Sequence, residues 1–239
     1  IILSNSLGAS LWMWSPQIAF LTQRYRVLSY DTRGHGGSDT PDGPYSMDDL
    51  VGDVIGLMDH FGIEKASFMG LSMGAMTGMG LALTVPERFD RMVLADGRAD
   101  APDPFRAMWD DRIGKVADGG LEAIADGTLA TWFTEDWRND NAATLEQVRA
   151  MILGNSAEGY IACCRALQGL DYLRHLGKVT VPTLYVGGSN DMGAAPAVMQ
   201  AMADATPGGR YVEIPNAAHV ANINAPEAYN AAIADFLEL

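Results

Sequence analysis

A serine between two glycines, placed where an apolar run meets a helical pattern, constrains the fold of this chain more than any other feature. The segment Gly70–Gly74 fits the pattern G-x-S-x-G, and the strand-like run Ala66–Met69 precedes it. The residues from Met73 through Leu83 have a helical pattern. A sharp strand-to-helix turn needs small residues two positions on either side of its serine, and it projects the hydroxyl above the sheet. The pattern therefore predicts Ser72 as a nucleophile at the carboxyl end of a strand.

Short apolar runs alternate with helical patterns before and after this turn. Arg26–Tyr30 and Arg91–Ala95 have the composition of buried strands. Between them, Ser46–Asp49 resembles a capping box with Asp in place of Glu, and it predicts the start of a helix. One face of that helix is expected to carry Leu50, Val54, Leu57, Met58 and Phe61. The alternation predicts an α/β fold with a mostly parallel sheet and helices on both faces.

The pattern changes in the middle of the chain. Residues 101–177 contain no convincing strand, but they carry three or four amphipathic segments rich in aromatic residues. Strand patterns return at Val181–Val186 and Tyr211–Ile214. We therefore predict a core made of residues 1–100 and 178–239, with residues 101–177 inserted as an all-helical cap.

Composition excludes several classes of function. Of the 239 residues 48% are hydrophobic and 19% charged, which is enough to form a buried core. The net charge of -14 repels nucleic acids and anionic membranes, and no run of about eighteen apolar residues is present. Cys163 and Cys164 are the only cysteines and are adjacent, so no disulfide framework is expected. These features predict a cytoplasmic protein without nucleic-acid or membrane partners.

A serine hydroxyl needs a base to remove its proton, and the chain offers four histidines. His219 follows the last strand pattern, at the sheet edge where ligands gather. His35 lies in a glycine-rich turn, His60 near a helix end, and His175 where the helical insertion returns to the core. We interpret these three as turn or surface residues and predict His219 as the base for Ser72.

The base in turn needs a carboxylate that fixes its tautomer and stabilises the imidazolium. Asp191 follows the strand pattern that ends near Val186, which gives the chain order Ser72, Asp191, His219 expected for hydrolases of this kind. Asp96 ends an earlier strand pattern and is the alternative. Chain order favours Asp191.

The oxyanion formed by attack needs hydrogen-bond donors fixed in advance, each worth roughly 3 kcal/mol of transition-state stabilisation. The backbone N–H of Met73, the residue after the nucleophile, is one expected donor. The other is expected from the first loop, Ser4–Gly8, where spacing favours the N–H of Leu7.

Together these segments resemble the α/β-hydrolase superfamily and, more narrowly, the 3-oxoadipate enol-lactonases and their relatives. The resemblance covers essentially the whole chain, and it implies a helical cap over the catalytic edge, no metal and no organic cofactor. It also implies hydrolysis of an enol-lactone in aromatic catabolism, and a further N-terminal segment carrying the first strands. The matching segments are Leu3–Gly8, Ser29–Gly36, Gly43–Ser46, Gly70–Gly74, Thr131–Thr134, Glu158–Cys164, Val181–Leu184 and Ala217–His219.

The substrate pocket is less well defined by the sequence. Trp132, Phe133 and Tyr160 lie in the cap, where aromatic residues either pack the helices or line the pocket. Asp96 and Arg98 stand beside the expected cleft, at a position where the resembling family commonly has Asn-Thr. A substrate carboxylate could be held by an arginine, although a lone arginine on a helical insertion is more often solvated. The candidates are Arg98, Arg138 and Arg165.

These residues predict a serine hydrolase that cleaves a small carboxylic ester or lactone through an acyl-enzyme. A cofactor-free perhydrolase or haloperoxidase would use the same three side chains and is one alternative. A binding protein on the same scaffold, with little turnover, is another. A dehalogenase is disfavoured because its chemistry needs a carboxylate nucleophile where this chain has Ser72.

Overall fold

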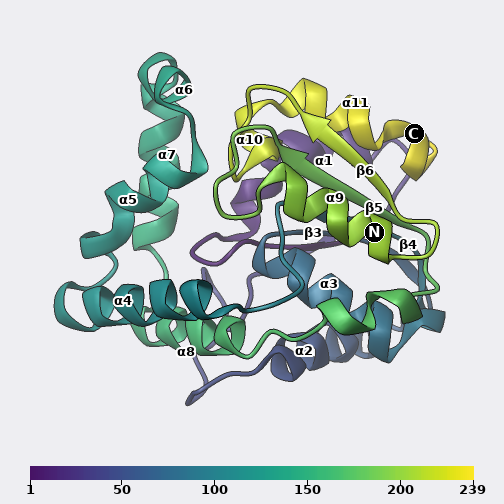
Figure 1. The fold of residues 1–239 in the computed structure, drawn as a ribbon, viewed down its shortest axis with the longest axis horizontal. Coiled ribbons are helices and arrows are strands. Elements are labelled where there is room, and N and C mark those ends of the chain that lie inside the picture. The colour runs from purple at the N-terminus through teal and green to yellow at the C-terminus, as the bar shows by residue number, and fades with distance from the viewer.

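The computed structural model describes all 239 residues and contains one six-stranded sheet (Figure 1). The strand order is β2-β1-β3-β4-β5-β6, and every neighbouring pair is parallel. The carboxyl ends of all six strands therefore meet at one edge of the sheet. The strands are β1 (Ile2–Ser4), β2 (Leu28–Ser29), β3 (Ala66–Leu71), β4 (Phe89–Ala95), β5 (Thr183–Gly188) and β6 (Arg210–Ile214).

Helices cover both faces of this sheet. Helices α2 (Met47–His60), α3 (Met73–Thr84) and α9 (Pro196–Ala205) lie on one face, and α1 (Ser15–Leu21) and α11 (Pro226–Leu237) on the other. Successive side chains of the buried strands alternate between the two apolar cores that result. This arrangement confirms the predicted fold class.

Helix α2 begins as its sequence predicts. The Ser46 hydroxyl accepts a hydrogen bond from the Asp49 N–H at 3.2 Å, and the Asp49 carboxylate accepts one from the Ser46 N–H at 2.8 Å. Leu50, Val54 and Met58 are buried, and Leu57 is half-buried. The prediction for Phe61 was wrong, since 57% of it is exposed. The helix ends at His60, so Phe61 no longer follows the helical face.

Strand β2 is shorter than its apolar run predicts. Only Leu28 and Ser29 of the run Arg26–Tyr30 are in the strand, and they pair with Ile2 and Leu3. The strand is the last one on its side of the sheet, so it has one neighbour to hold it. Whether an apolar run forms a strand depends on the neighbours it pairs with as well as on its own composition.

The segment between β4 and β5 contains five α-helices, where the sequence predicts three or four helical segments. A short 3-10 helix, Leu173–Lys178, follows the last of them and precedes β5. Figure 1 shows α4, α5, α6 and α7 projecting beside the sheet, with α8 below α4. The chain leaves and re-enters the core side by side, because the N–H groups of Tyr172 and Leu173 donate to the Ala99 carbonyl. None of the helices in the structure has the length and apolarity needed to cross a bilayer. The cap helices are α4 (Asp103–Gly119), α5 (Glu122–Trp132), α6 (Glu135–Asp140), α7 (Ala142–Leu153) and α8 (Ala157–Gln168).

Candidate active site

Ser72 occupies the sharp turn between β3 and α3. Its backbone angles, φ 56° and ψ -114°, are rarely adopted by residues that carry a Cβ, and such strain costs about 1–3 kcal/mol. The surrounding packing leaves no room for larger neighbours. A Cβ on Gly70 would collide with the Gly74 carbonyl, and one on Gly74 would collide with the Ser4 carbonyl. The two glycines of the motif are therefore required by close backbone approach.

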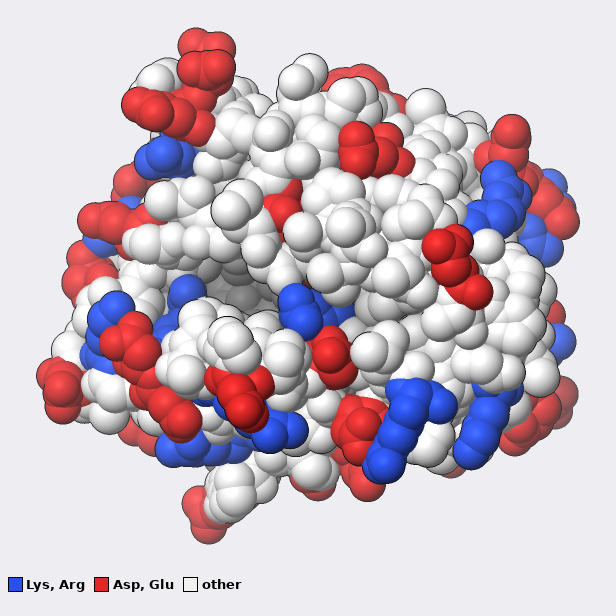
Figure 2. Space-filling view, in the orientation of Figure 1, with Lys and Arg blue, Asp and Glu red and all other residues white.

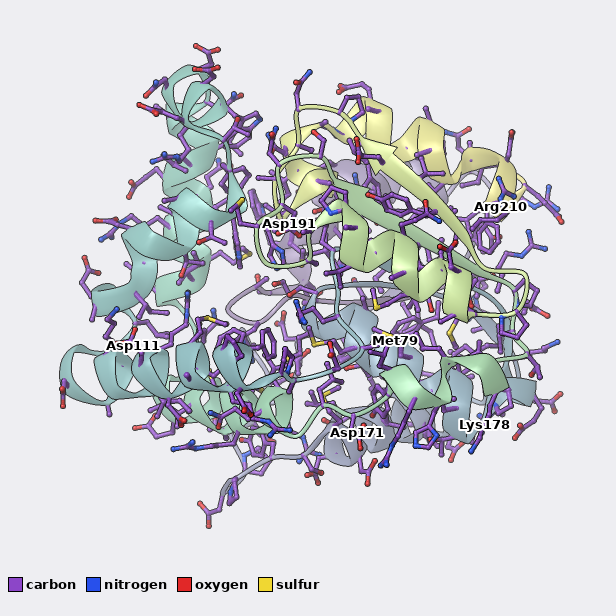
Figure 3. The ribbon with its side chains drawn as sticks, viewed as in Figure 1. Met79, Asp111, Asp171, Lys178, Asp191 and Arg210 are labelled. Carbon is purple, nitrogen blue, oxygen red and sulfur yellow. The ribbon has the colours of Figure 1, made fainter.

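Three side chains from the carboxyl ends of three strands form a continuous hydrogen-bonded chain. His219 Nε2 lies 2.9 Å from Ser72 Oγ, and His219 Nδ1 lies 2.8 Å from Asp191 Oδ2. Ser72 follows β3, Asp191 follows β5 and His219 follows β6, so the parallel sheet brings them to one edge. Figure 3 shows Asp191 in the loop beyond β5, on the side of the sheet that faces the cap helices. The structure thus brings the three sequence-predicted residues into contact.

The electrostatics of this chain suit a base that accepts the serine proton. Burial raises the pKa of Asp191. The charge of His219 lowers it, and so do the N–H groups of Gly193 and Ala194, which donate to Asp191 Oδ1 at 2.7 and 3.1 Å. Because these lowering effects are larger than the effect of burial, the net pKa is lowered. Burial lowers the pKa of His219, and the charge and hydrogen bond of Asp191 more than offset it, so the net pKa is raised. An ionised Asp191 therefore keeps a proton on Nδ1 and leaves Nε2 free to accept one from Ser72.

Asp96, the alternative acid, lies close by without a hydrogen bond to His219. Its Oδ1 accepts from the Gly188 N–H at 2.8 Å, and its Oδ2 has no protein partner. The residue is fully buried and adopts a positive φ of 48°. Burial, and then the charge of Asp191, raise the pKa of Asp96 well above its usual range. A buried carboxyl group with a raised pKa therefore lies beside the ionised pair.

The two N–H groups expected to bind an oxyanion are both available. Met73 is the first residue of α3, so its N–H has no partner within the helix. No protein acceptor takes the N–H of Leu7, which lines the same cavity as Ser72. The loop that carries Leu7 is held by His35, whose Nε2 accepts from the Gly8 N–H at 3.0 Å. Burial lowers the pKa of His35, which keeps the ring neutral and able to accept.

A cavity of about 130 Å³ lies above Ser72, between the cap helices and the core. Figure 2 shows the molecule hollowed there, with basic side chains at the rim. The residues that line the cavity include the predicted catalytic and oxyanion residues Ser72, His219 and Leu7, and four of the predicted pocket residues, Asp96, Arg98, Trp132 and Tyr160.

Of the three aromatic residues for which packing and pocket lining were both open, Phe133 does not line this cavity. Its ring stacks on Trp137 with centroids 4.1 Å apart, and only 1% of the residue is exposed. Residues 132 and 133 stand next to each other, but the end of α5 at Trp132 turns their side chains in different directions. Met76 of α3 is buried and also lines the cavity.

The three arginines considered from the sequence are not equivalent. Arg98 lines the cavity, pairs with Asp100 at 3.1 Å and lies over the Phe105 ring. Arg165 pairs with Asp110, and neither it nor Arg138 lines the cavity. A fourth arginine, Arg112 of α4, lines the cavity and was not predicted from the sequence. Its helical spacing from Trp109, which also lines the cavity, is the one signal that could have indicated it.

The assembled groups can carry out acyl transfer. They comprise a serine oxygen, an imidazole within hydrogen-bond distance, a carboxylate that orients the imidazole, and two N–H donors at the same cavity. No three His, Cys, Asp or Glu side chains are grouped so that they could hold a metal ion. The chemistry that this arrangement supports is nucleophilic attack by Ser72 on a carbonyl carbon.

Comparison with known proteins identifies the family of this chain. The model of the alpha/beta hydrolase fold family matches residues 1–226. The 3-oxoadipate enol-lactonase 2 of Acinetobacter baylyi is 38% identical over 233 residues, which are 98% of this chain and 86% of that protein. The crystal structure of the enol-lactonase from Burkholderia xenovorans LB400 is 40% identical, with a TM-score of 0.96 over 100% of this chain and 90% of that one. A thermophilic esterase from Thermogutta terrifontis is 28% identical, with a TM-score of 0.94 over 99% and 88% of the two chains. The chain therefore belongs to the alpha/beta hydrolase fold family.

Proposed function

We propose that this protein is a serine hydrolase that cleaves a small carboxylic ester or lactone, with 3-oxoadipate enol-lactone as the candidate natural substrate. The observation that carries the proposal is the hydrogen-bonded chain Ser72–His219–Asp191, with distances of 2.9 and 2.8 Å, at the floor of the cavity. The similarity to proteins named as enol-lactonases, at 38% and 40% identity, supports the lactone.

The reaction begins when His219 Nε2 takes the Ser72 proton as Ser72 Oγ attacks the carbonyl carbon. The oxyanion that forms is stabilised by the N–H groups of Leu7 and Met73. As the carbon–oxygen bond to the leaving group breaks, His219 returns its proton to the leaving oxygen. Asp191 orients His219 and stabilises its charged form throughout.

The second half of the reaction repeats these steps with water. His219 removes a proton from a water molecule, which attacks the acyl carbon, and Ser72 leaves with the proton that His219 returns. For a lactone, the leaving oxygen is part of the acyl group, so the reaction yields one ring-opened acid.

The size of the cavity limits the acyl group. Its volume is about 130 Å³, and one water molecule needs about 10–15 Å³ of comparable space. A substrate of roughly ten non-hydrogen atoms fits this space, whereas a long acyl chain does not. The cavity therefore favours small esters and lactones.

The test is a substrate screen with purified protein, using enol-lactones, saturated lactones and p-nitrophenyl esters of graded chain length. We expect hydrolysis of the small substrates and a steep fall in kcat/KM as the acyl chain lengthens. Ser72→Ala should lose turnover of every accepted substrate, and retained turnover would contradict the serine mechanism. Peracid formation from acetate and hydrogen peroxide, measured in parallel, would reveal a perhydrolase.

We also propose a cytoplasmic location. Cys163 and Cys164 are buried, unpaired thiols, and burial raises the pKa of Cys164 to about 12. Two such thiols persist most readily in a reducing compartment.

A further inference from the structure

The loop that carries the proposed oxyanion donor, the Leu7 N–H, turns sharply at Gly8. The Ala9 N–H donates to the Ser6 carbonyl at 3.1 Å, and Gly8 has a φ of 81°, as at the third position of a type II turn. Glycine adopts several backbone conformations at little cost, so the turn itself does not fix the peptide planes next to Leu7. The direction of the donor therefore depends on the groups that hold Gly8 from outside the loop.

Both polar groups of the Gly8 backbone are held by side chains from other segments. The Gly8 N–H donates to His35 Nε2 at 3.0 Å, and the Gly8 carbonyl accepts from Asn155 Nδ2 at 2.9 Å. Asn155 lies in the link between α7 and α8, so this second restraint comes from the cap. Among the cap residues, Asn155 alone is hydrogen-bonded to the loop Ser4–Gly8.

The Asn155 side chain is itself held from two directions. Its Oδ1 accepts from the Gly36 N–H at 2.9 Å, and its Nδ2 also donates to two carbonyls in the last turn of α7, at 2.9 and 3.0 Å. Gly36 directly follows His35, so Gly8, His35, Gly36 and Asn155 form a closed ring of contacts. The amide therefore keeps one orientation, which is set by the cap on one side and by the core on the other.

The link between α7 and α8 also contacts the core with its backbone. The Ser156 N–H donates to the Gly34 carbonyl at 3.2 Å. A Cβ on Gly34 would lie 2.5 Å from the Gly159 Cα, so the two backbones touch with no room for a side chain. Asn155 thus stands in a close contact between the cap and the core, beside the loop that carries the oxyanion donor.

We infer that Asn155 is a positioning residue for the oxyanion hole: through the Gly8 carbonyl it holds the turn that presents the Leu7 N–H to the cavity. This inference rests on the proposed hydrolase function and adds to it a role for the cap in stabilising the transition state. His35 restrains the turn from the core, and Asn155 restrains it from the cap. A donor that is fixed before the reaction needs no reorganisation when the oxyanion forms. Contact of the cap with the core therefore completes the oxyanion hole.

The test compares two small inhibitors that differ at one carbon atom. One is trifluoromethyl ethyl ketone, whose carbonyl carbon is attacked by Ser72 Oγ; the serine proton passes to His219 and the ketone oxygen becomes an oxyanion. The other is the alcohol obtained by reducing this ketone, which has no carbonyl to attack and forms no oxyanion. Each is measured as a competitive inhibitor of p-nitrophenyl acetate hydrolysis, by its Ki.

Asn155→Ala should lower kcat/KM and weaken binding of the ketone, because the turn at Gly8 loses one of its two restraints. Removal of a whole oxyanion donor costs about 100- to 1000-fold, so loss of one restraint should cost about 10-fold in each quantity. The Ki of the alcohol should not change. Asn155→Asp keeps the shape and the acceptor for the Gly36 N–H but turns an oxygen toward the Gly8 carbonyl, so its loss should be at least as large.

Asn141→Ala is the matched control. Asn141 is another half-buried asparagine of the cap, and its Nδ2 donates to the Trp137 carbonyl at 2.9 Å. Neither residue lines the cavity or contacts the loop of Leu7 through a hydrogen bond. This variant should keep kcat/KM and both Ki values.

The outcomes separate the two proposals. An unchanged Ki of the ketone in both Asn155 variants, or equal weakening of ketone and alcohol, would overturn the positioning role while p-nitrophenyl acetate is still hydrolysed. Absence of Ser72-dependent hydrolysis by the wild-type protein would instead overturn the hydrolase function itself. A Ki does not depend on how much of the enzyme is folded, so the ratio of the two Ki values stays decisive even if a substitution lowers stability.

Discussion

The strained backbone at Ser72 predicts an unusual response to substitution by glycine. Ser72→Ala and Ser72→Gly both remove the hydroxyl and its hydrogen bond to His219, so both should be inactive. They differ in the Cβ, which Ser72→Ala keeps in a conformation, φ 56° and ψ -114°, that glycine adopts readily. The difference in unfolding free energy between the two variants therefore includes the relief of this strain.

The expected magnitude follows from three contributions. Relief of the strain stabilises Ser72→Gly by about 2 kcal/mol, the middle of the usual range. The greater freedom of glycine in the unfolded chain destabilises it by about 0.7 kcal/mol, and loss of a buried methyl group by about 0.8 kcal/mol. Ser72→Gly should therefore be more stable than Ser72→Ala by about 0.5 kcal/mol, which corresponds to about 1–2 °C in Tm.

Ala75→Gly provides the matched control. Ala75 is fully buried three positions further along in α3, with no strained backbone angles. The loss of helix propensity and of one methyl group should destabilise this variant by about 1.8 kcal/mol. The change from Ala to Gly should thus differ by about 2 kcal/mol between the two sites, measured by urea unfolding with equal m values. If Ser72→Gly is less stable than Ser72→Ala by as much as Ala75→Gly is below wild type, the backbone at Ser72 is not strained.

Four further predictions concern the site. Asp191→Asn should lower kcat by several orders of magnitude while Asp96→Asn keeps most of it, and steady-state kinetics with one ester compares them. Because the pKa of His219 is raised and the neutral ring is the base, kcat/KM should fall as pH drops below that raised pKa, as a pH–rate profile will show. The raised pKa of Asp96 favours its neutral form in the folded state, so its stability contribution is present below the unfolded pKa of about 3.9 and lost as pH rises through the folded pKa. Asp96→Asn should therefore exceed wild type in urea resistance at pH 8 more than at pH 5, and equal gains would contradict this. His35→Ala removes the acceptor for the Gly8 N–H and should lower kcat more than it changes KM, whereas an unchanged kcat would show that the loop holds itself.

Local patterns predicted the elements in which the signal is self-contained. The sharp turn at Ser72 and the helix after it were predicted because the two glycines, the serine and the helical periodicity lie within a few residues. The capping box at Ser46 succeeded for the same reason. The prediction that Phe61 is on the buried face was wrong because periodicity indicates which face of a helix is apolar but not where the helix ends.

The proposed catalytic side chains were predictable because a parallel sheet has a simple geometric rule. Residues that follow β3, β5 and β6 meet at one edge, so chain order alone pointed to Ser72, Asp191 and His219. The lining of the cavity follows no such rule. Phe133 turned away and Arg112 turned inward because of the way α4, α5 and α8 pack, which depends on contacts between distant segments.

The wide separation of the proposed catalytic residues along the chain has a consequence for synthesis. Ser72 and His219 are 147 positions apart, so at about 5–20 residues per second the ribosome needs about 7–30 s to make the second after the first. Through that interval the serine has no base, and β5 and β6 must join the sheet before the base reaches it. The nascent chain therefore has no hydrolytic activity through this route, and activity begins only when all six strands have joined the sheet.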